Sequence, residues 1–132
     1  MARDNSDPGK GVVDIRRVYD AVPERPEPGR VFLVDRVWPR GIAKGSLDHD
    51  EWLRDVAPSP ELRRWFGHDP ERWEEFRERY RAELDARPET LRPLLDAARE
   101  HPVTLLYAAR DTEHNHARVL RDYLVEALSR ER

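Results

Sequence analysis

Cysteine is absent from all 132 residues of the chain. This absence excludes disulfide bonds, thiolate metal sites and cysteine nucleophiles, and with them rhodanese-type and cysteine-phosphatase mechanisms. Neither sign of charge dominates, because 24 basic residues oppose 27 acidic ones and leave a formal net charge of -3. The overall charge therefore indicates neither a nucleic-acid partner nor an acidic one.

Long apolar runs are also missing. Residues 1–10 are polar and contain Pro8 and Gly9, so the pattern fits neither a signal peptide nor a membrane span. We expect a cytoplasmic protein with no membrane partner. No two histidines have the i, i+4 spacing of helical zinc sites, and there is no glycine-rich phosphate loop or nucleophile elbow. The sequence therefore predicts no metal and no cofactor.

The residues that are present suit one compact domain with a densely charged surface. Hydrophobic residues make up 38% of the chain and charged residues 39%, the latter well above the usual share of about a quarter. We expect a flexible N-terminal tail over residues 1–11 and a single domain over residues 12–128.

Three short apolar runs predict strands at residues 12–18, 31–34 and 103–109. The last two are continuous apolar runs, as in strands buried on both faces of a parallel sheet. Residues 21–30 are rich in proline and predict a surface loop. The relative direction of the first two strands stays open at this point, because ten residues can form either a hairpin or a crossover.

Helices are predicted between these runs. A short one is expected around Trp52, Leu53 and Val56, and another follows the Ser59-Pro60 cap. Helical spacing predicts a third helix, and Pro88 opens a fourth. Asp111 and Thr112 offer caps for the last helix. The third helix carries Trp73, Phe76, Tyr80 and Leu84, the fourth Leu91, Leu94, Leu95 and Ala98, and the last Leu120, Tyr123, Leu124 and Leu128. The predicted fold is a small α/β domain with a mostly parallel sheet of three to four strands flanked by helices.

Two polar clusters follow the strands that end near Asp35 and Ala109. If these strands are parallel, both clusters lie at one sheet edge, where open α/β folds bind ligands. Cations there and a helix start both favour an anion. The candidate ligand-binding residues are Asp35, Arg36, Trp38, Arg40, Lys44, Tyr107, Arg110, Asp111, Thr112 and Asn115. Each also has a structural alternative: Arg36 could pair with Asp35 or Asp111, Trp38 could be a packing corner, and Tyr107 could belong to the core.

His116 is the candidate acid or base, since imidazoles titrate near neutral pH. The structural alternative is a hydrogen-bonded residue at a helix start. The string His114-Asn115-His116 is not expected to bind a metal, because residues two apart on a helix point in different directions.

At the same two clusters the sequence resembles the bacterial domain-of-unknown-function 488 family, in its YeaO-like branch. The resemblance covers roughly residues 15–124 and implies a small α/β protein without an established activity. It is carried by residues 17–20, by Val34-Asp35-Arg36-Val37-Trp38-Pro39-Arg40-Gly41, by residues 59–63, 65–70 and 76–84, and by Thr104-Leu105-Leu106-Tyr107-Ala108-Ala109.

The wider family often has cysteine at the position of Tyr107, and Cys-His-Arg at the position of Asn115-His116-Ala117. This chain has no cysteine at those positions and therefore cannot use thiol chemistry there. Its site would have to rely on Asn115, His116 and Arg36.

Three functional hypotheses follow. The first is a protein that binds an anionic or phosphorylated small molecule at the strand carboxyl ends. The second is a noncatalytic module for a protein or nucleic-acid partner, although acidic residues interrupt the Arg-rich stretch 62–81 and make nucleic acid the less favoured partner. The third is a hydrolase or transferase that uses His116 as acid or base. The oligomeric state is not predicted.

Overall fold

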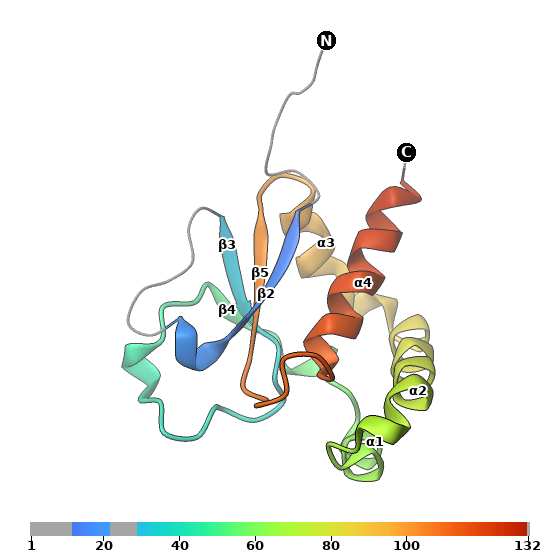
Figure 1. Cartoon of the computed structure of the whole chain (residues 1–132). Coiled ribbons are helices and arrows are strands. Elements are labelled where there is room, and N and C mark those ends of the chain that lie inside the picture. The colour runs from blue at the N-terminus through green and yellow to red at the C-terminus, as the bar shows by residue number, and fades with distance from the viewer. Residues whose placement is uncertain (1–11, 22–28, 132) are drawn as a thin grey trace.

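The computed structural model describes residues 12–21 and 29–131. The predicted N-terminal tail and most of the predicted loop at residues 21–30 lie outside these ranges. Four parallel strands form one sheet in the order β2-β5-β3-β4 (Figure 1). They are β2 (Val13–Arg17), β3 (Arg30–Leu33), β4 (Glu51–Trp52) and β5 (Val103–Tyr107). The first two strands are thus parallel and lie on either side of β5.

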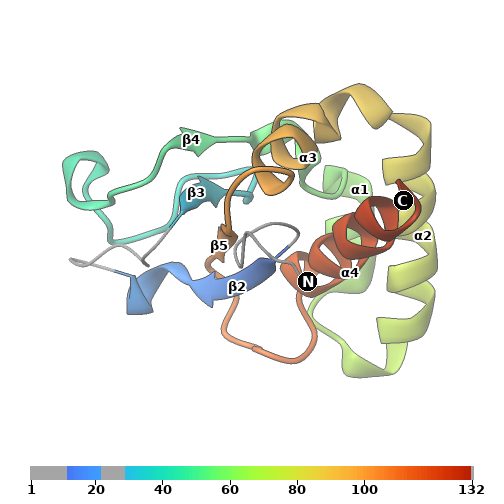
Figure 2. The same cartoon turned by 90° about the horizontal axis from the view of Figure 1, so that it is seen from above.

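Four α-helices lie on one face of the sheet (Figures 1 and 2). They are α1 (Pro60–Phe66), α2 (Trp73–Ala86), α3 (Arg92–Ala98) and α4 (His116–Ser129). Phe32, Leu105 and Val13 of the strands pack against buried helix residues such as Phe76, Tyr80 and Leu120. Because side chains alternate along a strand, Val31, Leu33 and Leu106 point to the other face.

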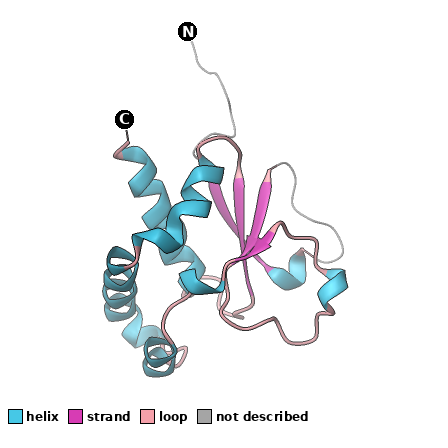
Figure 3. Cartoon of the chain, turned by 180° about the vertical axis from the view of Figure 1, so that it is seen from behind, coloured by secondary structure: helices cyan, strands magenta, loops and turns pink. Residues whose placement is uncertain are grey.

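No α-helix of residues 12–21 and 29–131 lies on the second face of the sheet. The connection between β3 and β4 crosses it and contributes Trp38, Ile42 and Leu47 to a smaller core (Figure 3). The fold class is therefore α/β, as predicted, with all the α-helices in a single layer. The carboxyl ends of β3 and β5 are left open at one edge between these two coverings.

Two of the expected local structures are wrong. The helix expected around Trp52 is a two-residue strand followed by one 3-10 turn (Arg54–Val56). The last helix begins at His116, and Asn115 caps it in place of Asp111 or Thr112. The Asn115 side-chain oxygen accepts from the Arg118 amide at 3.1 Å, and its amide group donates to the Asp111 carbonyl at 2.9 Å.

A close approach at Gly29 fixes the start of β3 beside β5. Gly29 has φ +111°, and a Cβ added there would lie 2.2 Å from the backbone oxygen of Pro102. The Arg30 amide donates to the same oxygen at 2.9 Å. Only glycine fits this position, because both the backbone conformation and the contact exclude a side chain.

We expect Gly29→Ala to lower the free energy of unfolding by at least about 2 kcal/mol, since it combines backbone strain with a clash against backbone. Gly45→Ala is the matched control, because a Cβ at Gly45 meets nothing within 4 Å. Denaturant unfolding of both variants measures the difference. Equal stabilities would contradict this account of Gly29.

We expect Asn115→Ala to lower the free energy of unfolding by about 1–2 kcal/mol, because a buried cap is lost. Thr112→Ala should change it by less than about 0.5 kcal/mol, since Thr112 is exposed and only its backbone carbonyl is bonded. Thermal unfolding of the two variants is the measurement. A larger loss of stability in Thr112→Ala than in Asn115→Ala would instead support Thr112 as the cap, as predicted from the sequence.

Candidate functional site

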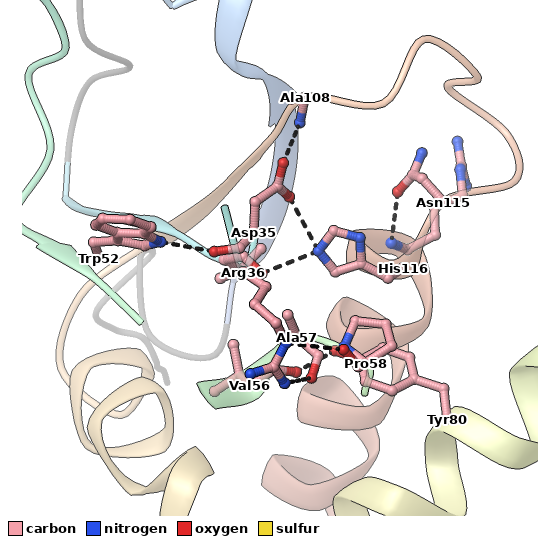
Figure 4. A network of polar contacts seen from close by, with 12 residues as sticks. Asp35, Arg36, Trp52, Val56, Ala57, Pro58, Tyr80, Ala108, Asn115 and His116 are labelled. Carbon is pink, nitrogen blue, oxygen red and sulfur yellow. Dashed lines mark hydrogen bonds and ion pairs between the residues drawn. The ribbon is translucent and has the colours of Figure 1, made fainter. Parts of the chain in front are cut away.

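The Asp35 carboxylate lies where β3, β5 and α4 meet (Figure 4). One oxygen, Oδ2, accepts from the Ala108 amide at 3.0 Å. The other, Oδ1, lies 3.2 Å from Nε2 of His116, and the two side chains are only 17% and 15% exposed. Oδ1 is buried and has no hydrogen bond of good geometry in the described part of the chain. The imidazole is therefore its nearest electrostatic partner.

The position of a proton on His116 follows from its neighbours. Nε2 also lies 3.0 Å from the carbonyl oxygen of Val34. A carbonyl only accepts, so Nε2 must carry a hydrogen and donate it. Among the described residues Nδ1 has no hydrogen-bond partner, and it is not one of the buried unpartnered atoms. Nδ1 is thus the ring nitrogen that is open to solvent.

Arg36 holds the segment that precedes α1. Its Nη2 donates to the carbonyl of Ala57 at 3.1 Å and its Nε to that of Pro58 at 3.3 Å (Figure 4). It pairs with neither Asp35 nor Asp111. The Tyr80 hydroxyl donates to the neighbouring carbonyl of Val56. Burial, and then the negative charge of Glu83, raise the pKa of Tyr80, so that hydroxyl stays a donor.

Ser59 completes the positioning of α1. Its hydroxyl accepts from the Leu62 amide at 3.1 Å, as the sequence predicts, and donates to Glu83 of α2 at 2.7 Å. Glu83 also accepts from the Ser59 amide at 2.9 Å. The first turn of α1 is therefore tied both to the strand end, through Arg36, and to α2.

Two adjoining cavities of about 350 and 240 Å³ lie at this edge of the sheet. We call them together the strand-end cleft. Both cavities are lined by Pro58, Arg63, His68, Ala109 and His116. The larger cavity adds Pro60, Arg64, Phe66, Phe76, His114 and Asn115, and the smaller adds Asp35, Arg36, Val37, Ala57 and Ala108.

The strand-end cleft carries more positive than negative groups. Arg63 and Arg64 are exposed, and in residues 12–21 and 29–131 neither side chain has an ion pair or hydrogen bond. Three histidines, 68, 114 and 116, add ring nitrogens. Among the described residues Asp35 is the only carboxylate in the lining, and it already faces His116. Charged donors without acid partners make the cleft favourable for an anion.

Four residues predicted from sequence come together here: Asp35, Arg36, Asn115 and His116. They differ in whether a polar atom of the side chain is still available to a ligand. Asn115 is 2% exposed, and its oxygen and nitrogen both serve the start of α4. His116 keeps a free ring nitrogen.

Trp38, Arg40 and Lys44 lie away from the cleft. Trp38 belongs to the core on the other face of the sheet and donates to the Ile42 carbonyl. Lys44 lies 6.0 Å from its ring. The Arg40 side chain is exposed, and its backbone oxygen accepts from the Tyr19 hydroxyl. The chain after Arg36 thus turns toward the face opposite the helices.

The remaining candidates serve the turn or the core, apart from Arg110, which is exposed and outside the cleft lining. Tyr107 is 2% exposed, and burial raises the pKa of its hydroxyl. Asp111 accepts from the amides of Glu113 and His114, and these bonds lower its pKa. Thr112 is exposed, and its carbonyl accepts from Arg118.

Sequence reasoning did not assign Arg63, Arg64, His68 and His114 to the site. Arg63 and Arg64 belong to a stretch with alternating charges, which favours a solvated helix face. The spacing of Leu62 and Phe66, both buried, places Arg63 beside the buried face of α1. That spacing does not tell which strand end the face meets.

Two further kinds of feature are absent from residues 12–21 and 29–131. No three side chains among histidine, aspartate and glutamate gather there in a way that would hold a metal ion. No helix there has both the length and the apolar character needed to cross a membrane.

Comparison with known proteins finds relatives of unknown function. The chain is 45% identical to the uncharacterised protein YeaO of Escherichia coli K12, over 85% of this chain and 96% of that protein. It is 43% identical to the uncharacterised proteins Mb3100c of Mycobacterium bovis and Rv3073c of Mycobacterium tuberculosis H37Rv, over 85% of this chain and 92% of each relative. No solved structure gives a significant match.

A family model described as the inactive DUF488-N3 subclade matches residues 12–132, which include every residue of the strand-end cleft. Together with the YeaO similarity, this match agrees with the resemblance found in the sequence. The chain belongs to the DUF488 family, in the subclade described as inactive.

Proposed function

We propose that this protein binds a small anionic molecule, such as a phosphorylated metabolite, in the strand-end cleft and does no chemistry on it. The observation that carries the proposal is the charge of the cleft lining. Arg63 and Arg64 have no acid partner in the described residues, whereas the one carboxylate, Asp35, faces His116. A free anion is the partner that such a lining lacks.

The size and walls of the cleft suit a small ligand. The larger cavity, at about 350 Å³, falls at the lower end of the range for small-molecule sites. Pro58, Phe66 and Phe76 supply apolar walls. Such walls exclude water and strengthen charged hydrogen bonds in the cleft. A single sugar phosphate or mononucleotide fits this description better than a polymer.

His116 acts as a binding residue in this proposal. Its Nε2 hydrogen is held between Val34 and Asp35, so an anion meets Nδ1. As the imidazolium, the ring donates to the anion through Nδ1. The description of the matched subclade as inactive supports binding over the hydrolase or transferase alternative.

The first prediction concerns Arg63. Sulfate, phosphate, sugar phosphates and mononucleotides should raise the melting temperature of the wild type, because they bind the native state. Arg63→Ala should weaken the binding of the best of them roughly tenfold or more, as expected for one lost charged hydrogen bond. Isothermal titration measures the dissociation constants.

Two variants serve as controls. Arg92→Ala removes an exposed arginine of α3 outside the cleft lining and should leave affinity unchanged. Arg36→Ala should lower the free energy of unfolding by about 1–3 kcal/mol, since the carbonyls of Ala57 and Pro58 lose their donor.

The absence of a melting-temperature shift with any small anion would contradict the proposal. Strongly salt-dependent binding to an oligonucleotide alone would favour the interaction module.

A further prediction concerns His116, with sulfate as the probe. His116→Gln should weaken sulfate binding roughly fivefold or more at one fixed pH, as expected when one hydrogen-bonding group is lost. His68 and His114 also line the cleft.

Single variants separate the three histidines. His68→Gln and His114→Gln should each weaken sulfate binding less than His116→Gln does. Isothermal titrations of the three variants under identical conditions provide the comparison. An unchanged sulfate affinity in His116→Gln would remove His116 from the binding role.

A further inference from the structure

Strand β2 is an edge of the sheet, with free backbone groups along its outer side. The Val103 amide donates to the Val12 carbonyl at 2.9 Å, and Val13 is level with Val103. In a parallel pair this register turns the backbone groups of residues 12, 14 and 16 toward β5. The backbone groups of Val13 and Ile15 and the amide of Arg17 therefore point outward, whereas the Arg17 carbonyl accepts the first bond of the 3-10 turn Val18–Asp20. Within the part of the chain that is described, no strand pairs with them.

The side chains of this edge carry one charge of each sign. Asp14 and Arg16 are exposed, and neither side chain has an ion pair or hydrogen bond in the described ranges. Both lie on the sheet face opposite the helices, because Val13 and Ile15 pack on the helix side. Ile15 separates the two charges.

Apolar surface lies beside the same edge. Val12 and Val125 are 38% and 40% exposed, and they are two of the few large apolar side chains exposed in the described residues. Val125 also lines a shallow groove of about 420 Å³ where α4 meets β2, together with Val13, Arg121, Asp122 and Glu126. Figure 1 shows α4 beside β2 at this side of the molecule.

We propose that this edge is a dimer interface, in which β2 pairs with β2 of a second copy in antiparallel orientation, with Ile15 on the two-fold axis. The outward groups of Ile15 then bond to those of the partner's Ile15. The Val13 carbonyl accepts from the amide of the partner's Arg17, and the reverse. One eight-stranded sheet runs through both copies.

The charges select this register. With Ile15 on the axis, each Asp14 lies directly opposite the partner's Arg16, and such opposite charges stabilise a cross-strand pair. A shift of two residues one way places Asp14 against the partner's Asp14. The opposite shift places Arg16 against the partner's Arg16. Both alternatives are repulsive, so the sequence Asp14-Ile15-Arg16 is complementary to itself in one antiparallel register only.

The helices complete the interface. Since α4 packs on β2, the two-fold axis brings α4 next to its counterpart on the same face of the sheet. The groove residues of one copy then face the same residues of the other, as in any two-fold interface. Val125 is covered, and Arg121, which pairs with Asp122 of its own chain at 3.1 Å, lies at the same surface. A second copy of the chain is therefore the occupant that suits the backbone, the charges and the apolar side chains of this edge.

The test is a charge-swap series followed by sedimentation velocity or light scattering at about 5–200 µM protein. The wild type should be a dimer. Asp14→Arg and Arg16→Asp should each weaken dimerisation at least tenfold, because each places like charges opposite one another. The double variant D14R/R16D restores opposite charges and should dimerise like the wild type. Glu78→Arg, an exposed charge reversal on α2, should dimerise normally.

Circular dichroism and melting temperature should show that all the variants fold. A monomeric wild type over the whole concentration range overturns the proposal. So does a dimer that tolerates both single reversals, or one that the double variant fails to restore. Any of these results leaves anion binding in the strand-end cleft untouched, because the edge and the cleft share no residue.

Discussion

The Asp35 carboxylate joins three parts of the chain that are far apart in sequence. Asp35 follows the end of β3 by two residues. Its carboxylate accepts from the amide of Ala108, just after β5, and lies against His116 in the first turn of α4. Burying a carboxylate is costly unless partners compensate it. The backbone amide and the imidazole supply that compensation. They can do so only when β3 and β5 end side by side and α4 starts above them.

The chemistry of the cleft follows from this arrangement. Because Asp35 is occupied, it does not neutralise the arginines of α1 on the opposite wall. Arg36 points to the carbonyls of Ala57 and Pro58 and holds that wall at its place. The positive character of the cleft therefore comes from Arg63 and Arg64, which the rest of the protein leaves without acid partners in the described residues. Arg36 thus holds the wall, whereas Arg63 and Arg64 give the cleft its positive charge.

Much of the fold could be predicted because local patterns agreed with the final structure. The periodicity of α2 and the Ser59 cap are examples, as are the apolar runs of β3 and β5. Strand β4 could not be recognised, because two residues carry no alternation and Trp52, Leu53 and Val56 have helical spacing. The start of α4 was ambiguous, since Asp111 and Asn115 are both good caps. Tertiary contacts chose between them.

The site residues could be predicted only where they follow the carboxyl ends of parallel strands. Parallel strands end at one edge, so the two polar clusters that contain Asp35 and His116 are predicted to lie together, and these two side chains do. Which face of the sheet each residue after Arg36 covers depends on tertiary packing. The chain beyond Arg36 turns away from the helices and takes Trp38, Arg40 and Lys44 with it. Arg63 reaches the cleft because α1 packs on that end, a long-range outcome that charge spacing within the helix does not encode.

The strand order also has a consequence for how the chain folds as it is synthesised. β2 has β5 as its strand neighbour, and the paired positions 13 and 103 are 90 residues apart. Contacts of such long sequence separation form slowly, because a large loop must close first. On the ribosome, both sides of β2 stay unpaired until nearly the whole chain has been made. The first of the described strands to be synthesised is thus among the last to enter the sheet.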